Sequence, residues 1–141
     1  MSTNFNSEKR NEWHWINTKK GKYLQAESLR ERGFIHGFFT KEWNGQSPKQ
    51  IVNLLNPSLS VHMCNQVHGS EIIEASNTIE SFIPKADGLV SDHKNQSLWV
   101  CTADCIPVLL ADPVNSIVSA IHAGWKGLAR NILTKAIQKL E

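Results

Sequence analysis

The feature that most constrains the fold is a change in the spacing of apolar residues along the chain. Short apolar runs rich in β-branched residues fill positions 61–122 with no helical pattern between them, which predicts strands of a mostly mixed or antiparallel sheet. After Gly124 the spacing becomes helical, which predicts one amphipathic helix over residues 128–140. The sequence therefore predicts an α/β fold of the layered α+β kind, in which a mixed β-sheet is flanked by helices.

The length of 141 residues is that of one ordinary domain, which buries roughly two thirds of its unfolded surface. We therefore expect residues 1–141 to form a single domain. Near its start, the pattern predicts a strand pair turned at Gly21 and a strand over residues 34–40. Ser47 followed by Pro48 predicts the start of a short helix, because serine caps helices and proline is favoured at the first helical position.

The charge pattern argues against nucleic acid and membrane partners. The 15 Lys and Arg residues nearly balance the 13 Asp and Glu residues, whereas a nucleic-acid-binding domain usually has a clustered basic face. No apolar run approaches the roughly 20 residues needed to cross a bilayer. The polar segment 1–10 lacks the apolar core of a secretory signal. We expect a cytoplasmic protein whose three cysteines are reduced thiols.

Polar residues interrupt the apolar runs at the points where strands end. The motif TADCIP sets a carboxylate and a thiol beside one strand, and IHAGWKG sets an imidazole at the end of another. Burying such groups without partners costs free energy, and strand ends commonly gather at one edge of a sheet. We therefore expect these positions to share one site. The residues concerned are Gln66, His68, Asp87, Asp104, Cys105 and His122.

Two imidazoles and one thiol in this set, from His68, Cys105 and His122, suit a metal ion. Zinc accepts these ligands in a tetrahedral arrangement, and three protein ligands leave the fourth position for water or substrate, as in catalytic sites. Asp104 or Asp87 could hold the second ring nitrogen of a ligand histidine or accept a proton. The ordinary alternative is that each histidine is a hydrogen-bonded core residue and the cysteine a small apolar filler.

The same residues allow two further functions. Cys105 as nucleophile and His122 as base would make a cysteine hydrolase or deamidase. A metal-binding module without enzymatic activity is the other reading. A copper oxidase is the least expected function, because its copper centres need several histidine-rich clusters that the sequence lacks.

The segment HAGWKGLAR is a candidate anion site. Its glycine-rich turn enters a predicted helix, with Lys126 and Arg130 in the first turns. Free backbone N–H groups and the helix dipole favour an anion at such a place. The structural alternative is that Gly124 and Gly127 only allow close packing of Trp125.

Four motifs, NQVHG, KADGL, TADCIPVLLAD and IHAGWKG, occur in an order and spacing that resemble the YfiH-type purine nucleoside phosphorylase family, once labelled multicopper polyphenol oxidases or laccases. The earlier HGFFTK resembles the family's entry strand. The resemblance implies a fold similar to the catalytic domain of cytotoxic necrotizing factor and a zinc site at His68, Cys105 and His122. It also implies phosphorolysis of adenosine, inosine, guanosine and methylthioadenosine by phosphate, and deamination of adenosine.

On this resemblance we expect two groups of functional residues. The catalytic group is Cys105, His122 and Asp104, and the group that contacts substrate or phosphate is Lys41, Gln66, Asp87 and Lys126. The family usually has arginine at the positions of Lys41 and Lys126, and lysine keeps the charge but loses the planar two-point grip on phosphate. EWNGQS also replaces a tighter Gly-Gly-x-Ser turn.

Family members are considerably longer than this chain. The last predicted helix reaches Glu141 without a Gly, Asn or Pro terminator. We therefore expect the chain to be the N-terminal part of a longer YfiH-like domain. A sheet left with an open edge would favour association, so a homo-oligomer is a further expectation.

Overall fold

The computed structural model describes residues 12–141, and the segment expected to lack a secretory signal lies outside the described residues. The chain divides into two compact units, Met1–Gln46 and Ser47–Glu141. The membership of both units in a single domain stays a prediction. Within the described residues the fold combines helices with mixed sheets, so the predicted layered α+β class is confirmed.

The first unit contains a three-stranded antiparallel sheet in the order β1-β2-β3. The hairpin predicted at Gly21 is confirmed, and the Thr18 hydroxyl closes it by donating to the Gly21 carbonyl at 2.7 Å. The strand predicted over 34–40 is reduced to two residues. The elements of this unit are β1 (Trp13–Asn17), β2 (Lys22–Ala26), α1 (Glu27–Arg30), β3 (Phe38–Phe39) and the 3-10 helix η1 (Lys41–Trp43).

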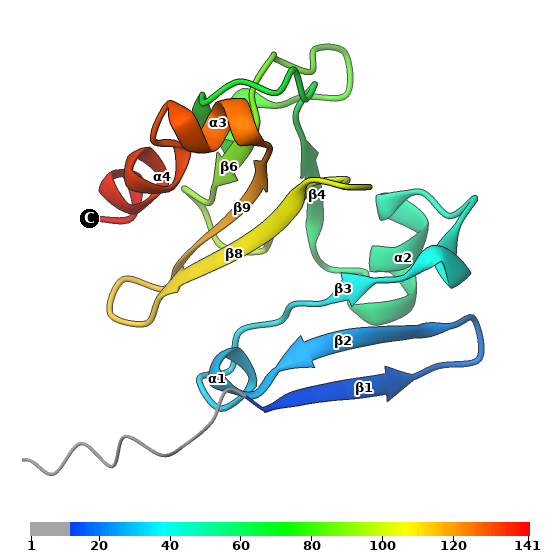
Figure 1. The fold of residues 1–141 in the computed structure, drawn as a ribbon. Helices are drawn as coiled ribbons and strands as arrows, with labels where there is room; N and C mark the ends of the chain where they lie inside the picture. The colour runs from blue at the N-terminus through cyan, green and yellow to red at the C-terminus, as the bar shows by residue number, and fades with distance from the viewer. Residues whose placement is uncertain (1–11) are drawn as a thin grey trace, which may run out of the picture. The chain divides into compact units, whose positions relative to one another are not determined.

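The second unit contains the predicted strands and the C-terminal helices, and its strands form two sheets (Figure 1). One sheet is the parallel pair β4-β7, and the other is four-stranded in the order β5-β6-β9-β8. The elements are α2 (Pro48–Leu55), β4 (Ser60–Met63), β5 (Ile72–Glu74), η2 (Ala75–Asn77), β6 (Gly88–Val90), β7 (Gln96–Trp99), β8 (Ile106–Asp112), β9 (Ile117–Ala123), α3 (Trp125–Ala129) and α4 (Ile132–Leu140).

Helix α2 begins where the sequence predicts. Ser47 accepts a hydrogen bond from the Gln50 N–H, and the Gln50 side chain accepts one from the Ser47 N–H, which completes a capping box. Pro48 occupies the first helical position. The reciprocal bonds satisfy two N–H groups that a helix start otherwise leaves without partners.

The core of the second unit lies between α4 and the four-stranded sheet. Ile132 and Ala136 of α4 and Ile121 of β9 are all fully buried, and α4 is drawn beside β6 and β9 in Figure 1. Burying a branched apolar side chain of this size stabilises the fold by roughly 1.5–3 kcal/mol. This contact fixes β9, whose last residues lead into the candidate site.

The predicted helix over 128–140 is wrong in one respect, because it is two helices. Asn131 has a φ of 60°, in the left-handed region, and separates α3 from α4. Asparagine tolerates this conformation better than most residues, so the helical spacing of apolar residues continues through a break in the backbone. Helix α3 starts at Trp125, after Gly124 as its N-cap, which is earlier than the pattern predicts.

Among residues 12–141, none of the helices has both the length and the apolar content that a membrane span requires.

Candidate metal centre

The buried carboxylate of Asp87 organises the loop that follows β4. Three successive backbone N–H groups donate to it: Val67 at 3.2 Å, His68 at 2.9 Å and Gly69 at 2.7 Å. His68 has a φ of 58°, which is uncommon for a residue other than glycine. A left-handed residue within such a turn aims consecutive N–H groups at one anion. The carboxylate therefore fixes the backbone conformation that presents the His68 ring.

The same carboxylate orients His122 at the end of β9. Asp87 directly precedes β6, and its carbonyl accepts from the His122 N–H at 2.7 Å, so the two residues face each other across the sheet. The Nδ1–H of His122 donates to Asp87 Oδ1 at 2.8 Å. Because an ionised carboxylate can only accept, this bond assigns the proton to Nδ1. The ring nitrogen left for a metal ion is Nε2.

The charge of Asp87 is stabilised by these contacts. Burial by itself raises the pKa of the carboxyl group, but the hydrogen bonds from His122 and from the three backbone N–H groups outweigh it and lower the pKa below its ordinary value of 3.8. Asp87 is therefore an anion at neutral pH although its residue is fully buried. The anion keeps His122 in the tautomer that a metal ion needs.

Cys105 lies at the end of an irregular segment between β7 and β8. Its segment is joined to the sheet at Ile106, which pairs with Ala123 of β9. At the other end, the Gln66 side chain bonds to the backbone of Cys101. Gly124 makes room beside the thiol, because a Cβ atom at that position would lie 3.3 Å from Cys105 Sγ and 3.4 Å from His68 Cδ2.

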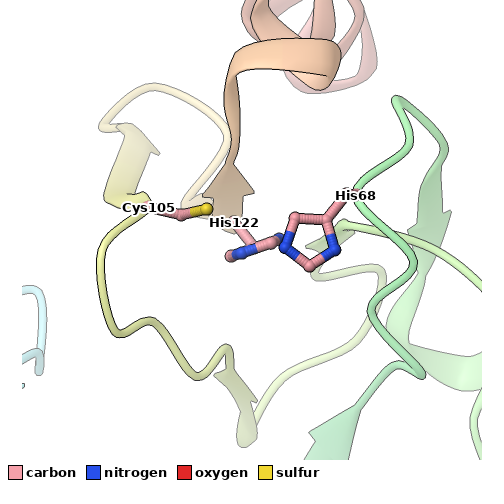
Figure 2. Close-up of side chains that lie close together, drawn as sticks. All are labelled: His68, Cys105 and His122. Atoms are coloured by element: carbon pink, nitrogen blue, oxygen red, sulfur yellow. The ribbon is translucent and has the colours of Figure 1, made fainter.

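His68, Cys105 and His122 come together from three separate segments, and Figure 2 shows their side chains converging. Their ligand atoms all lie within 4.8 Å of one another, and the two imidazole rings meet edge to face with centroids 4.9 Å apart. A tetrahedral zinc ion holds such donor atoms roughly 3.3–3.7 Å apart. The observed upper limit exceeds this spacing by only about 1 Å, so the three residues fit a metal ion after a small closing movement.

The other predicted site residues take different places. Asp104 is exposed, and within residues 12–141 its side chain has no hydrogen-bond partner, so Asp87 is the carboxylate that holds a ligand histidine. Lys126 is exposed on α3, with Nζ 5.5 Å from the centroid of the Trp125 ring. Lys41 belongs to η1 of the first unit. The substrate contacts expected of Gln66 and Asp87 stay predictions. The observed hydrogen bonds join Gln66 to Cys101, and Asp87 to the His68 loop and to His122.

Two residues of the site were not expected there from the sequence. The sequence predicts Gly124 either in the turn of an anion site or as space for Trp125, whereas in the structure its missing side chain leaves space beside Cys105 and His68. Gly127 was interpreted likewise, and a Cβ there would lie 2.6 Å from the Gly69 carbonyl oxygen, so α3 packs directly on the His68 loop. The signal in the sequence is that both glycines lie within five residues after His122.

The remaining histidines of the second unit have other partners. The ring of His62 bonds to the hydroxyls of Ser60 and Thr78, and His93 lies beside Asp92. Within residues 12–141, the His68, Cys105 and His122 group is the one set of three or more such side chains that could hold a metal ion.

The fold and the site together define a layered α+β protein with a two-histidine, one-cysteine group that could hold a metal ion. Residues 44–141 match the model of the family described as multi-copper polyphenol oxidoreductase laccase. The chain belongs to this family, which confirms the resemblance inferred from the four motifs.

Curated relatives in this family are named purine nucleoside phosphorylases. The chain is 38% identical to one from Synechocystis sp. over 133 residues, which cover 90% of this chain and 50% of that protein. It is 46% identical to one from Rickettsia conorii over 92 residues, which cover 65% and 38%. One from Streptomyces griseus is 40% identical over 144 residues, which cover 83% and 58%. The chain spans about half the length of the curated relatives it matches.

Two solved structures have a similar fold. A crystal structure of a Neisseria meningitidis protein aligns with a TM-score of 0.61 and 26% identity, over 94% of this chain and 58% of that one. The Bacillus licheniformis protein YfiH aligns with a TM-score of 0.51 and 28% identity, over 64% and 37%. These similarities agree with the family assignment.

Proposed function

We propose that the chain is a zinc-dependent purine nucleoside phosphorylase that also deaminates adenosine. The observation that carries the proposal is the meeting of His68, Cys105 and His122 within 4.8 Å, beside a buried carboxylate, in a chain whose relatives are named purine nucleoside phosphorylases. The proposed substrates are adenosine, inosine, guanosine and methylthioadenosine, and the proposed location is the cytoplasm.

In phosphorolysis, a phosphate oxygen forms a bond to C1′ of the ribose while the C1′–N9 bond breaks, and the purine leaves with a proton on nitrogen. In deamination, water adds at C6 of adenosine and ammonia leaves, which gives inosine. Zinc bound by the three ligands would supply Lewis-acid chemistry. Copper also accepts two imidazoles and a thiolate, so metal analysis must decide between the two ions.

The residues of the chain have separate parts in this proposal. Asp87 holds His122 by its Nδ1–H and holds the loop of His68, so the site is organised before substrate arrives. The exposed side chain of Lys126 would attract phosphate, and Lys41 is proposed for the same task. Asp104, exposed and next to Cys105, would accept or return a proton.

The test is turnover of adenosine with and without phosphate, with adenine, ribose 1-phosphate and inosine separated by chromatography. We expect His68→Ala, Cys105→Ala and His122→Ala to lose turnover. Cys101→Ala is the matched control, because Cys101 lies on the same segment but outside the group. Unchanged turnover in all three ligand variants would rule the proposal out. Metal bound without turnover of any nucleoside would favour a metal-binding module instead.

One observation favours a second function. Asp87, His122 and Cys105 lie in the order of a carboxylate, an imidazole and a thiol, which is also the arrangement of a cysteine hydrolase or deamidase. Alkylation by iodoacetamide separates the two functions. A metal-bound thiolate is protected, so labelling of Cys105 only after metal removal would argue against the hydrolase.

A further inference from the structure

The side-chain amide of Gln66 is bonded to both backbone groups of one residue. Its Nε2 donates to the Cys101 carbonyl at 2.7 Å, and its Oε1 accepts from the Cys101 N–H at 2.8 Å. An amide that makes both bonds at once acts as the backbone of a neighbouring strand would. Within residues 12–141, no other side-chain hydrogen bond reaches residues 100–105.

The pairing of β4 with β7 explains why a side chain is needed there. These strands run parallel through the pair Met63 and Trp99, and two steps further the same register would set Asn65 opposite Cys101. The backbone of Asn65 is already engaged elsewhere: its N–H donates to Pro84 at 2.8 Å and its carbonyl accepts from Ala86 at 3.2 Å. The Gln66 amide therefore continues the ladder that the backbone has left.

The two hydrogen bonds between the Gln66 amide and the Cys101 backbone form a clamp. This clamp joins the segments that carry two of the three proposed metal ligands. His68 follows Gln66 by two residues, and Cys105 follows Cys101 by four. Asp87 fixes His68 and His122 but makes no hydrogen bond to the Cys105 segment. We propose that Gln66 is a positioning residue that holds the Cys105 segment against the His68 loop and thereby sets the metal affinity of the group. The inference rests on the metal binding proposed above.

The test compares Gln66→Ala and Gln66→Glu with the wild-type chain. Glutamate keeps an acceptor for the Cys101 N–H but loses the donor for the Cys101 carbonyl. The metal affinity of Gln66→Glu should therefore lie between those of the wild type and Gln66→Ala. Gln96→Ala is the matched control, because Gln96 also accepts from two backbone N–H groups, those of Asp92 and His93, outside the metal-ligand group.

Two readouts are needed. The first is Co²⁺ affinity by competition with a chelator, followed by the thiolate-to-cobalt absorption band. The second is amide hydrogen exchange of peptides covering 100–106 in the metal-free chain, with α4 peptides as the reference for global unfolding. We expect Gln66→Ala to bind Co²⁺ about tenfold more weakly and to exchange faster at 100–106 but not in α4. Gln96→Ala should match the wild type at 100–106 and in its Co²⁺ affinity.

Either of two results would overturn the inference: a Gln66→Ala affinity within about twofold of the wild type, or unchanged exchange at 100–106. A wild-type chain that takes up no Co²⁺ and no Zn²⁺ would instead overturn the proposed function. Hydrogen exchange at 100–106 would then show by itself whether Gln66 holds the Cys105 segment. Failure of the proposed function and failure of the Gln66 inference can therefore be told apart.

Discussion

Replacing Asp87 by asparagine should both destabilise the second unit and weaken metal binding. The carboxylate accepts hydrogen bonds from four N–H donors, and each oxygen takes two of them. Asparagine has one acceptor oxygen and one NH₂ group, so two of the four donors lose their acceptor whichever way the amide lies. A buried donor left without a partner costs about 1–3 kcal/mol, which predicts a total loss of about 3 kcal/mol from a typical 5–15 kcal/mol.

The assay is urea unfolding of the metal-free chain, followed by circular dichroism, together with chelator competition for metal. We expect Asp87→Asn to lose 10–100-fold in metal affinity, roughly the effect of removing a residue that orients a ligand histidine. Asp92→Asn is the control for metal affinity, because Asp92 also accepts several hydrogen bonds but lies outside the metal-ligand group. An Asp87→Asn chain with stability within about 0.5 kcal/mol of the wild type and equal metal affinity would refute the reasoning.

The pH dependence of the same variant gives an independent check. Because the pKa of Asp87 is lowered on folding, its stabilisation is complete above the unfolded pKa and is lost as the pH falls through the folded pKa. The wild-type chain should therefore lose stability as the pH falls below the ordinary value of 3.8. Asp87→Asn should lose less stability over that range. An identical acid limb in both chains would contradict the charge assigned to Asp87.

The remaining predictions concern four other residues. Gly124→Ala should weaken metal binding about tenfold in a chelator titration, because its Cβ would press on Cys105 and His68; unaltered affinity would mean that the ligands move aside freely. Gly127→Ala should cost about 1–3 kcal/mol in urea unfolding, since its Cβ would meet the Gly69 carbonyl oxygen at 2.6 Å. Cys64 should stay unlabelled by iodoacetamide at pH 8 in the folded chain, because burial and the nearby Asp87 charge raise its pKa to about 11; peptide mass spectrometry would detect the contrary. Hydrogen bonds from Ser76 and Gln96 outweigh the burial of Asp92 and lower its pKa to about 2. Asp92 should therefore add stability that disappears between pH 4 and 2. In Asp92→Asn, the free energy of unfolding should change less with pH in that window.

The candidate site could be predicted from the sequence to the extent that strand ends mark it. His68, Cys105 and His122 interrupt apolar runs beside Gly or Pro, and these positions do meet. The choice between Asp87 and Asp104 could not be made, because both carboxylates adjoin strand ends. The register between β6 and β9 decides it by setting Asp87 opposite His122. Register depends on pairing between distant segments, which local spacing does not reveal.

The sequence predicts the fold class but not the break between α3 and α4 or the separation of the strands into two sheets. The apolar period of residues 128–140 persists through Asn131, so the left-handed residue that separates α3 from α4 leaves no trace in the hydrophobic pattern. Similarly, β4 and β7 form a sheet separate from the other strands, although the apolar runs of all these strands have the same pattern in the sequence. The contacts of Gln66 follow from where the β4-β7 ladder stops, which is a tertiary feature.

The central claim is that three segments of this chain build one metal site, and the most direct test is the metal content of the purified protein. Elemental mass spectrometry after exhaustive dialysis would compare the wild-type chain with Cys105→Ala and Cys101→Ala. The account predicts close to one zinc per chain in the wild type and in Cys101→Ala, and its loss in Cys105→Ala. Zinc absent from all three chains, or retained by Cys105→Ala, would contradict it.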